Sequence, residues 1–255
     1  MLFSQKFYLY TKHIILRSLV KLNFLYLKDY RQLLFEELQI IKNQPGLNIL
    51  EIGPKDGIDT KNLLKLKPSK LTLIDLPDKK KGINNWIKEI DSSRVSIYYE
   101  NIMYEDAIVN ESPYDIIWCT GVLYHNPEQL RFLKRLYKVL KPGGTLVIET
   151  ATSRRIGLNN EIGAVEIWDD IDNKTKRKYH LSKNISHLPN KAAVNIWLKQ
   201  VGFNKIMLSK CFKNNPMLKL KRVGFLATKP LNELPKKNRS YYNIANLNYE
   251  IGESK

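Results

Sequence analysis

From residue 47 onward, short apolar runs bounded by Gly, Pro and Asp alternate with segments of helical periodicity. Such runs are typical of parallel strands that helices cover on both faces. The alternation therefore predicts an α/β fold built on a doubly wound sheet. The expected strands are Asn48–Ile52, Leu71–Asp75, Val95–Tyr99, Tyr114–Cys119 and Thr145–Glu149, followed by two more near Lys205–Lys210 and Val223–Thr228. The expected helices lie near Thr60–Leu66, Ile83–Ile90, Glu128–Leu140 and Ala192–Val201.

The segments on either side of this pattern differ from it. Residues 1–44 carry apolar positions at near-helical spacing and end at a Pro-Gly pair, which predicts an N-terminal helical extension that packs across a cleft or the sheet edge. A basic amphipathic helix on a membrane surface is the alternative. Residues 45–230 form the expected α/β domain, in which the polar stretch 154–189 is an insertion above the sheet. Residues 231–255, rich in Asn, Lys and Tyr, are expected to be a flexible tail.

Charge and cysteine content limit the class of protein. The formal net charge of +17 over 255 residues fits an acidic partner such as RNA, anionic lipid or a phosphorylated sugar nucleotide, or a bias toward Lys and Asn codons. Cys119 and Cys211 cannot build a disulfide framework, and no Cys/His spacing predicts a zinc site. Arg17, Lys21 and Lys28 interrupt the N-terminal apolar stretch before it reaches membrane-spanning length. These features favour a cytoplasmic protein.

The segment LNILEIGPKDGIDT, residues 47–60, predicts the floor of a cofactor site. The strand that carries Glu51 ends at Gly53, which permits a sharp turn and a close backbone approach, and Gly57 does the same at the start of a helix. Ligands of open α/β sheets bind beyond the carboxyl ends of the strands. A dinucleotide fingerprint needs G-x-G-x-x-G, but Lys55 and Ile58 occupy its second and third glycine positions. This favours a cofactor that lacks a pyrophosphate.

Polar residues follow the next two expected strands. Asp75 ends LTLID, about twenty residues after the glycine turn, where a carboxylate can accept hydrogen bonds from both ribose hydroxyls of an adenosine. A helix N-cap or turn role is the alternative for Asp75. Asn101 and Ile102 follow the third strand, where a polar side chain can meet the adenine amino group, although a turn Asn explains the position as well.

The long pattern YDIIWCTGVLYHNPEQLRFLKRLYKVLKPGGTLVIET, residues 114–150, runs from a strand through a loop, an amphipathic helix and a Pro-Gly-Gly turn into another strand. Together with EIGPKDG and LTLID, it resembles class I S-adenosylmethionine-dependent methyltransferases. The resemblance extends from about Leu47 to Pro230. It implies a Rossmann-like seven-stranded methyltransferase sheet and S-adenosyl-L-methionine as the cofactor.

The segments GVLYHNPEQL and SHLPNKAAVNIWLKQVGF are similar to the family that modifies the tRNA wobble uridine with carboxy-S-adenosylmethionine. Carried over by position, Thr120 and Tyr124 face the sulfonium end of the cofactor. That family has a longer N-terminal region and places basic residues around the extra carboxylate, one of them an Arg near its C-terminal strands. Here Lys219, Lys221 and Arg222 only lie near that point, which favours ordinary methyl transfer. The expected cofactor-binding residues are Glu51, Gly53, Lys55, Gly57, Asp75, Asn101, Ile102, Thr120 and Tyr124.

Methyl transfer from a sulfonium requires proximity and orientation, and a base only where the acceptor must lose a proton. His125 is the candidate base, with a pKa near 6.5 if unperturbed, and the alternative is a histidine that orders its loop. Lys55 is either solvated or in contact with the methionine carboxylate of the cofactor. The acceptor is expected to contact the polar stretch, whose candidate residues are Glu166, Trp168, Tyr179 and His187. In the same stretch, the pair Arg154 and Arg155 either holds a phosphate or is a solvated pair.

The sequence thus predicts a methyltransferase that acts on a small molecule or a glycan precursor at oxygen or nitrogen. Modification of the tRNA wobble uridine, by carboxymethyl or methyl transfer, is the alternative within enzymes. A non-catalytic Rossmann-like protein that binds nucleic acid or a partner enzyme is the alternative from another class. Neither a metal nor a membrane span is expected.

Overall fold

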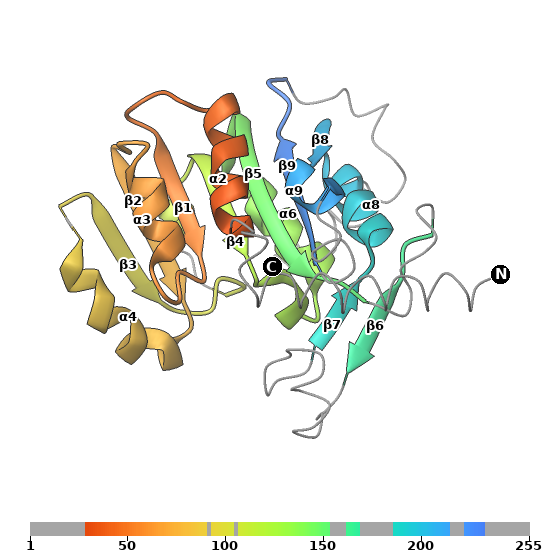
Figure 1. Ribbon diagram of the computed structural model, residues 1–255, viewed down its shortest axis with the longest axis horizontal. Helices are drawn as coiled ribbons and strands as arrows, with labels where there is room; N and C mark the ends of the chain where they lie inside the picture. Colours follow the sequence, from red (N-terminus) through yellow and green to blue (C-terminus); the bar gives the residue numbers. More distant parts are fainter. Residues whose placement is uncertain are drawn as a thin grey trace, which may run out of the picture.

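The computed structural model describes residues 29–90, 93–104, 107–153, 162–168, 186–214 and 222–232. Its main sheet has seven strands in the order β3-β2-β1-β4-β5-β9-β8 (Figure 1). The strands β1 to β5 are parallel, whereas β9 pairs antiparallel with both β5 and β8. A separate antiparallel pair joins β6 to β7. This arrangement confirms the α/β sheet and the closing strand pair that the sequence predicts.

The expected elements appear in the expected order, with bounds that differ by a few residues. The strands are β1 Asn48–Ile52, β2 Lys70–Asp75, β3 Val95–Tyr99, β4 Tyr114–Thr120, β5 Leu140–Ala151, β6 Val165–Trp168, β7 Ser186–Pro189, β8 Lys205–Leu208 and β9 Arg222–Thr228. The α-helices are α2 Tyr30–Ile41, α3 Ile58–Leu64, α4 Lys80–Trp86, α5 Ala107–Asn110, α6 Gln129–Val139, α8 Lys191–Val201 and α9 Lys210–Asn214. The short 3₁₀ helices are η1 Pro77–Lys79, η2 Ile87–Glu89 and η3 Leu123–His125. The structure adds α5, α9 and the antiparallel pair of β6 and β7, which the sequence analysis does not predict.

The largest difference from expectation is at β5, which begins at Leu140 rather than at Thr145. Leu140 pairs with Tyr114, and the next pair in the register joins Thr145 to Ile116. The Pro-Gly-Gly segment is thus an irregularity within the strand, because Pro lacks the N–H group that a regular ladder requires.

Helices cover both faces of the sheet and bury separate hydrophobic clusters. One cluster packs α6 and α8 against the sheet through Phe132, Leu136 and Leu198, all fully buried. The other packs α2, α3, α4 and α9 against the opposite face. In Figure 1, α2 and α3 lie in front of the sheet and α6 lies behind it. The carboxyl ends of β1, β2, β3 and β4 meet at one pocket, to which the first turn of α2 also contributes.

The helix α2 belongs to the N-terminal segment that the sequence predicts to be a helical extension. Asp29 caps it by accepting a hydrogen bond from the backbone N–H of Arg31. Leu34, Phe35 and Leu38 have at most 1% of their surface exposed and lie in the second cluster. Burying three such side chains contributes roughly 1.5–3 kcal/mol each, so packing rather than intrinsic helix propensity holds α2 in place.

Candidate functional site

The loop after β1 turns sharply at Gly53. Its φ of +73° lies in the left-handed region, and its N–H donates to the carbonyl of Ile74 at 2.9 Å. A Cβ at this position would stand 2.8 Å from Cγ2 of Val122. A side chain here would therefore meet both backbone strain and a clash, which is the reason for glycine at the end of this strand.

Trp86 of α4 contacts the next two glycine-loop positions that matter here, Lys55 and Gly57. Gly57, with a φ of +73°, caps α3, and a Cβ there would stand 2.5 Å from the Trp86 ring. The indole N–H of Trp86 donates to the carbonyl of Lys55 at 2.9 Å. Lys55 itself has a φ of +42°, an uncommon conformation for a residue with a Cβ. The loop is thus fixed against α4, with the Lys55 side chain on the pocket side.

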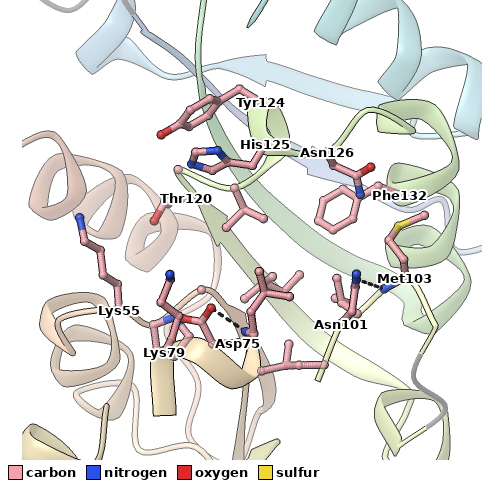
Figure 2. Close-up of a pocket in the computed structure, with 18 of the residues that line it drawn as sticks. Lys55, Asp75, Lys79, Asn101, Met103, Thr120, Tyr124, His125, Asn126 and Phe132 are labelled. Atoms are coloured by element: carbon pink, nitrogen blue, oxygen red, sulfur yellow. Dashed lines mark hydrogen bonds between the residues drawn. The ribbon is translucent and has the colours of Figure 1, made fainter. Parts of the chain in front are cut away.

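These loops enclose a cavity of about 1070 Å³ at the carboxyl ends of β1, β2, β3 and β4. Its wall includes most residues predicted for the cofactor, namely Gly53, Lys55, Asp75, Asn101, Ile102, Thr120 and Tyr124, together with His125. Figure 2 shows Tyr124 and His125 on one side of this pocket and Asp75 and Asn101 on the other. Glu51 and Gly57 are not part of the wall. The structure thus brings all the other predicted residues together.

Glu51 has a different environment from the one expected of a cofactor ligand. It is 1% exposed and accepts a hydrogen bond of 2.7 Å from Oγ1 of Thr60 in α3. Burial raises its pKa well above the usual value, and the nearby Asp59 raises it further. Its contact ties β1 to α3 beneath the glycine loop.

Asp75 ends β2 with its side chain at the pocket. Its Oδ1 accepts the N–H of Leu76 at 2.8 Å, a local turn contact. It is not the N-cap of the following helix, because Leu76 occupies that position in η1. Burial raises the pKa of Asp75, although the backbone N–H groups of Leu76 and Lys55 lower it. Asp75 therefore combines a turn contact with a place in the wall of the cavity.

Asn101 also makes the local contact that the turn alternative predicts. Its Oδ1 accepts the N–H of Met103 at 3.0 Å, as the dashed line in Figure 2 shows. Asn101 and the buried Ile102 both line the cavity beyond β3. The side-chain oxygen of Asn101 thus organises the turn that presents both residues.

His125 lies in η3, where its ring packs 3.9 Å, centroid to centroid, from that of Tyr124. Burial lowers the pKa of His125 to about 4, and the positive charges of Arg222, Lys79 and Lys55 act in the same direction. The imidazole is therefore neutral at neutral pH. It is also a weaker base than an unperturbed histidine.

An ion pair that the sequence did not single out stands at the same side of the pocket. Arg222, at the start of β9, donates through Nε and Nη2 to the buried carboxylate of Glu149, with 2.8 Å between Nη2 and Oε2. Glu149 also accepts the N–H of Gly121 at 3.0 Å. Burial lowers the pKa of Arg222, but the facing carboxylate outweighs this and raises it above its ordinary value. Arg222 lines the cavity, so a basic residue that the sequence places only near the family's Arg position is part of the site.

The N-terminus of α2 completes this wall. Tyr30 and Arg31 line the cavity, and the Arg222 guanidinium lies 5.2 Å from the Tyr30 ring centroid and 6.0 Å from that of Tyr124. Arg31 pairs with Asp29 at 2.9 Å and with Asp56 of the glycine loop at 3.1 Å. No local sequence pattern placed these residues at the pocket, because the contacts of Arg31 with Asp56 and of Tyr30 with Arg222 join segments that are distant in sequence.

The residues expected to meet an acceptor are not part of the cavity wall where the structure describes them. Glu166 of β6 accepts a hydrogen bond from Ser153, and the carbonyl of His187 in β7 accepts one from Gln129 at 2.7 Å. Trp168 ends β6. Arg154, Arg155 and Tyr179 lie outside the described residues.

Metal and membrane features are also absent from the described part of the chain. No group of His, Cys, Asp and Glu side chains there could hold a metal ion. None of its helices combines the length and apolar character that crossing a bilayer requires. Cys119 and Cys211 are both buried, and neither forms a disulfide bond.

A family model described as a methyltransferase domain matches residues 23–208. The chain is 27% identical over 181 residues to a protein named tRNA U34 carboxymethyltransferase from Helicobacter pylori strain J99, covering 69% of this chain and 65% of that protein. The protein of the same name from Helicobacter acinonychis is 27% identical over 208 residues, with 79% and 74% covered. The chain therefore spans about two thirds of the length of the Helicobacter pylori relative.

Solved structures show the same fold at low identity. The N-terminal domain of EvdMO1, solved with SAH bound, superposes with a TM-score of 0.57 at 15% identity, covering 82% of this chain and 84% of that one. A 1,6-didemethyltoxoflavin-N1-methyltransferase from Burkholderia thailandensis gives 0.53 at 17% identity, with 78% of each chain covered.

Proposed function

This chain belongs to the methyltransferase domain family, and from that premise we propose that it transfers a methyl group from S-adenosylmethionine to a small molecule or a glycan precursor, at oxygen or nitrogen. The observation that carries the proposal is the cavity at the carboxyl ends of the parallel strands. It unites the Gly53 turn, Asp75 and Thr120 in one wall. That position is where open α/β sheets bind their ligands.

The residues present fit this cofactor. The adenosine would lie over β2 and β3, with its ribose at Asp75 and its base beside Asn101 and Ile102. Gly53 lines the cavity and carries no side chain, so the ligand can approach the backbone there. The sulfonium end would point toward Thr120 and Tyr124, and Lys55 is available to the methionine carboxylate.

The bound cofactor supplies a methyl group already activated by its positive sulfur. The protein then has to hold the acceptor in line with the sulfur–methyl bond and exclude water. The aromatic side chain of Tyr124, 9% exposed, forms part of the wall at that end. An amine that is already neutral needs no base, whereas a hydroxyl must lose a proton, for which His125 is the candidate.

Space in the pocket supports a small acceptor. The cavity of about 1070 Å³ is slightly larger than the pockets typical of small-molecule sites, so it can hold a cofactor and part of a second molecule. Beyond the cofactor residues its wall includes Met103, Asn126 and Phe132. Phe132 and Met103 are at most 6% exposed and close the pocket beside Asn101, so of the three only Asn126 offers a group, its amide, to a compact acceptor.

Carboxymethyl transfer to the tRNA wobble uridine is the second candidate. Two observations favour it, namely the names of the similar Helicobacter proteins and the position of Arg222 in the pocket. Glu149 already neutralises Arg222 through two hydrogen bonds, however. A further carboxylate would have to share that guanidinium, and a buried anion without its own cation is strongly disfavoured. We therefore propose ordinary S-adenosylmethionine as the preferred cofactor.

Two measurements test the proposal. Mass spectrometry of small molecules retained by the purified protein should find S-adenosylmethionine or S-adenosylhomocysteine, and recovery of the carboxylated form would favour the tRNA candidate. Incubation with methyl-labelled S-adenosylmethionine should then transfer label to a low-molecular-weight fraction of a cell extract. Label in tRNA would overturn the choice of acceptor. Tight cofactor binding with no labelled product in any fraction would favour a catalytically silent binding protein.

A further inference from the structure

Gln129, the first residue of α6, has a buried amide that contacts two other elements. The residue is 4% exposed. Its Nε2 donates to the carbonyl of Leu123 in η3 at 3.1 Å and to the carbonyl of His187 in β7 at 2.7 Å. An amide nitrogen carries two hydrogens, and these two bonds use both of them. One side chain thus joins the start of α6, the turn η3 and the β6–β7 pair.

The β7 end of this contact is anchored to other parts of the fold. Asn190, which follows β7, accepts the N–H of Ala193 in α8 at 2.8 Å, and its Nδ2 donates to the carbonyl of Ile162, ahead of β6, at 2.7 Å. Ser153, beyond the end of β5, donates its N–H to the carbonyl of Pro189 at 3.3 Å. These bonds tie the β6–β7 pair to α8 and β5, so the pair can act as a fixed support.

The η3 end of the contact belongs to the pocket wall. Leu123 is the first residue of η3, and the next two, Tyr124 and His125, line the cavity with their ring centroids 3.9 Å apart (Figure 2). The Leu123 carbonyl also accepts the N–H of Asn126 at 3.1 Å, which closes the turn. A single 3₁₀ turn forms few internal hydrogen bonds, so its position depends on contacts with its surroundings.

A neutral amide suits this position. Both partners are carbonyl oxygens, which only accept hydrogen bonds, so the buried group has to donate twice. A lysine at position 129 would place a buried charge beside the two carbonyls, and an apolar side chain would remove their shared donor. Glutamine provides the two donors without a charge.

The contact of Gln129 gives the β6–β7 pair an indirect role at the pocket. Glu166 and His187 are not part of the cavity wall, although the sequence predicts that they meet an acceptor. We propose that Gln129 is a positioning residue, which holds Tyr124 and His125 against the support of β6 and β7 at the end of the pocket where the acceptor approaches. The inference rests on the proposed function and deepens it, because the inserted strand pair then shapes the acceptor site without touching the acceptor.

The test follows the His125 imidazole by NMR in the wild type and in Gln129→Met, which keeps the length of the side chain and removes both donors. Burial lowers the pKa of His125 to about 4, and the charges of Arg222, Lys79 and Lys55 act in the same direction. The wild-type ring should therefore stay neutral above about pH 5. In the variant, η3 loses its support and the ring gains water, so we expect the pKa to rise above about 5, toward the ordinary value near 6.5. The spectrum of His125→Asn assigns the signal.

A second readout is the rate of labelled methyl transfer. We expect the turnover number of Gln129→Met to fall about tenfold or more, because a small displacement of the wall misplaces the acceptor. The KM for S-adenosylmethionine should change less than about threefold, since Asp75, Asn101 and Ile102 at the other side of the pocket keep their places.

The matched control is Leu198→Ala, which removes a fully buried side chain of α8 and no donor to η3. It should lower the melting temperature while leaving the pKa of His125 unchanged. An unchanged pKa of His125 in folded Gln129→Met, or an equal rise in Leu198→Ala, would overturn the inference. If Gln129→Met does not fold, the same criteria apply to Gln129→Asn, whose amide is one methylene shorter and cannot keep both bonds. A wild type that binds no S-adenosylhomocysteine contradicts the proposed function, whereas the titration of His125 tests Gln129 independently of it.

Discussion

At the scale of single residues, Asp75 shows how one side chain serves a turn and a pocket together. Its contact with the N–H of Leu76 is the local role that many turn carboxylates have. The same residue lies in the wall of the cavity at the end of a parallel strand. A turn role alone would make no difference to ligand affinity, so substitution separates the two.

We expect Asp75→Ala to weaken binding of S-adenosylhomocysteine about 10- to 100-fold, because the ribose hydroxyls lose a charged acceptor worth about 1.5–3 kcal/mol. Calorimetry on the purified variant measures this. Asp78→Ala is the control, since that neighbouring carboxylate is mostly exposed and should change affinity less than about threefold. A change below about twofold for Asp75→Ala would leave Asp75 as a turn residue only.

His125 has a testable pH dependence. Its pKa of about 4 means that the neutral, basic form is already complete at pH 6 and is lost only as the pH falls through about 4. If His125 is the base for a hydroxyl acceptor, His125→Ala lowers turnover by about 10²–10⁴, with cofactor affinity unchanged. The wild-type rate should stay level between pH 6 and 8 as far as this group determines it.

The alternative role of His125 gives the opposite pattern. A histidine that orders η3 through its contact with Tyr124 would, when replaced, weaken cofactor binding and lower the melting temperature. Measuring turnover, cofactor affinity and melting temperature on one variant distinguishes the two roles. Undiminished turnover would exclude His125 from catalysis.

At the scale of elements, α2 connects the N-terminal segment to both the core and the pocket. Its buried residues pack against the sheet, and its first turn places Tyr30 and Arg31 in the cavity wall. The opposite side of the helix is exposed, with Ile40 82% accessible. One helix thus offers a buried and an exposed aliphatic position for comparison.

Leu38→Ala should lower the free energy of unfolding by about 2–5 kcal/mol, because the side chain is fully buried and its removal leaves a cavity. Ile40→Ala, two residues away in the same helix, should change it by less than about 0.5 kcal/mol. Urea unfolding of both variants measures the difference. Equal effects would mean that α2 does not pack on the sheet as described.

The elements were predictable where one local pattern determined them. The apolar runs indicate β1, β2 and the centre of β4, because burial on both faces leaves a continuous signal. The start of β5 was not predictable, since Pro142 and two glycines indicate a turn and only the pairing of Leu140 with Tyr114 extends the strand. Tertiary pairing outweighed local propensity there.

The candidate site was likewise predictable only where a local pattern or a simple positional rule identified its residues. The rule that ligands lie at the carboxyl ends of strands is enough to group Gly53, Asp75 and Thr120 from the sequence alone, and all three line the cavity. Contacts across long separations were beyond that rule. Arg222 meets Glu149 from 73 positions away and Trp118 meets Asp59 from 59. Each partner alone looks like an ordinary strand or helix residue in the sequence.

At the scale of the whole molecule, the formal net charge of +17 bears on the choice between a small acceptor and tRNA. A chain with this charge attracts any polyanion at low salt, so binding to RNA is not by itself evidence for an RNA substrate. Such binding releases counterions from phosphates and weakens steeply as salt rises. If the protein recognises a particular base, the affinities for two RNAs that differ at that base keep a constant ratio when both are measured at the same salt concentration.

Two tRNAs that differ only at the wobble position, one with uridine and one with cytidine, therefore provide the decisive comparison. For a small-molecule methyltransferase we expect their affinities to agree within about twofold at every salt concentration, and both to fall by orders of magnitude between 50 and 200 mM salt if several phosphates are contacted. Methyl transfer to the small acceptor should change much less over the same range, because a compact ligand in the pocket displaces few counterions. Filter binding and labelled methyl transfer measure the two quantities in the same buffers. A preference of tenfold or more for the uridine tRNA at 150 mM salt, which corresponds to about 1.4 kcal/mol, would instead identify base recognition and make tRNA the acceptor.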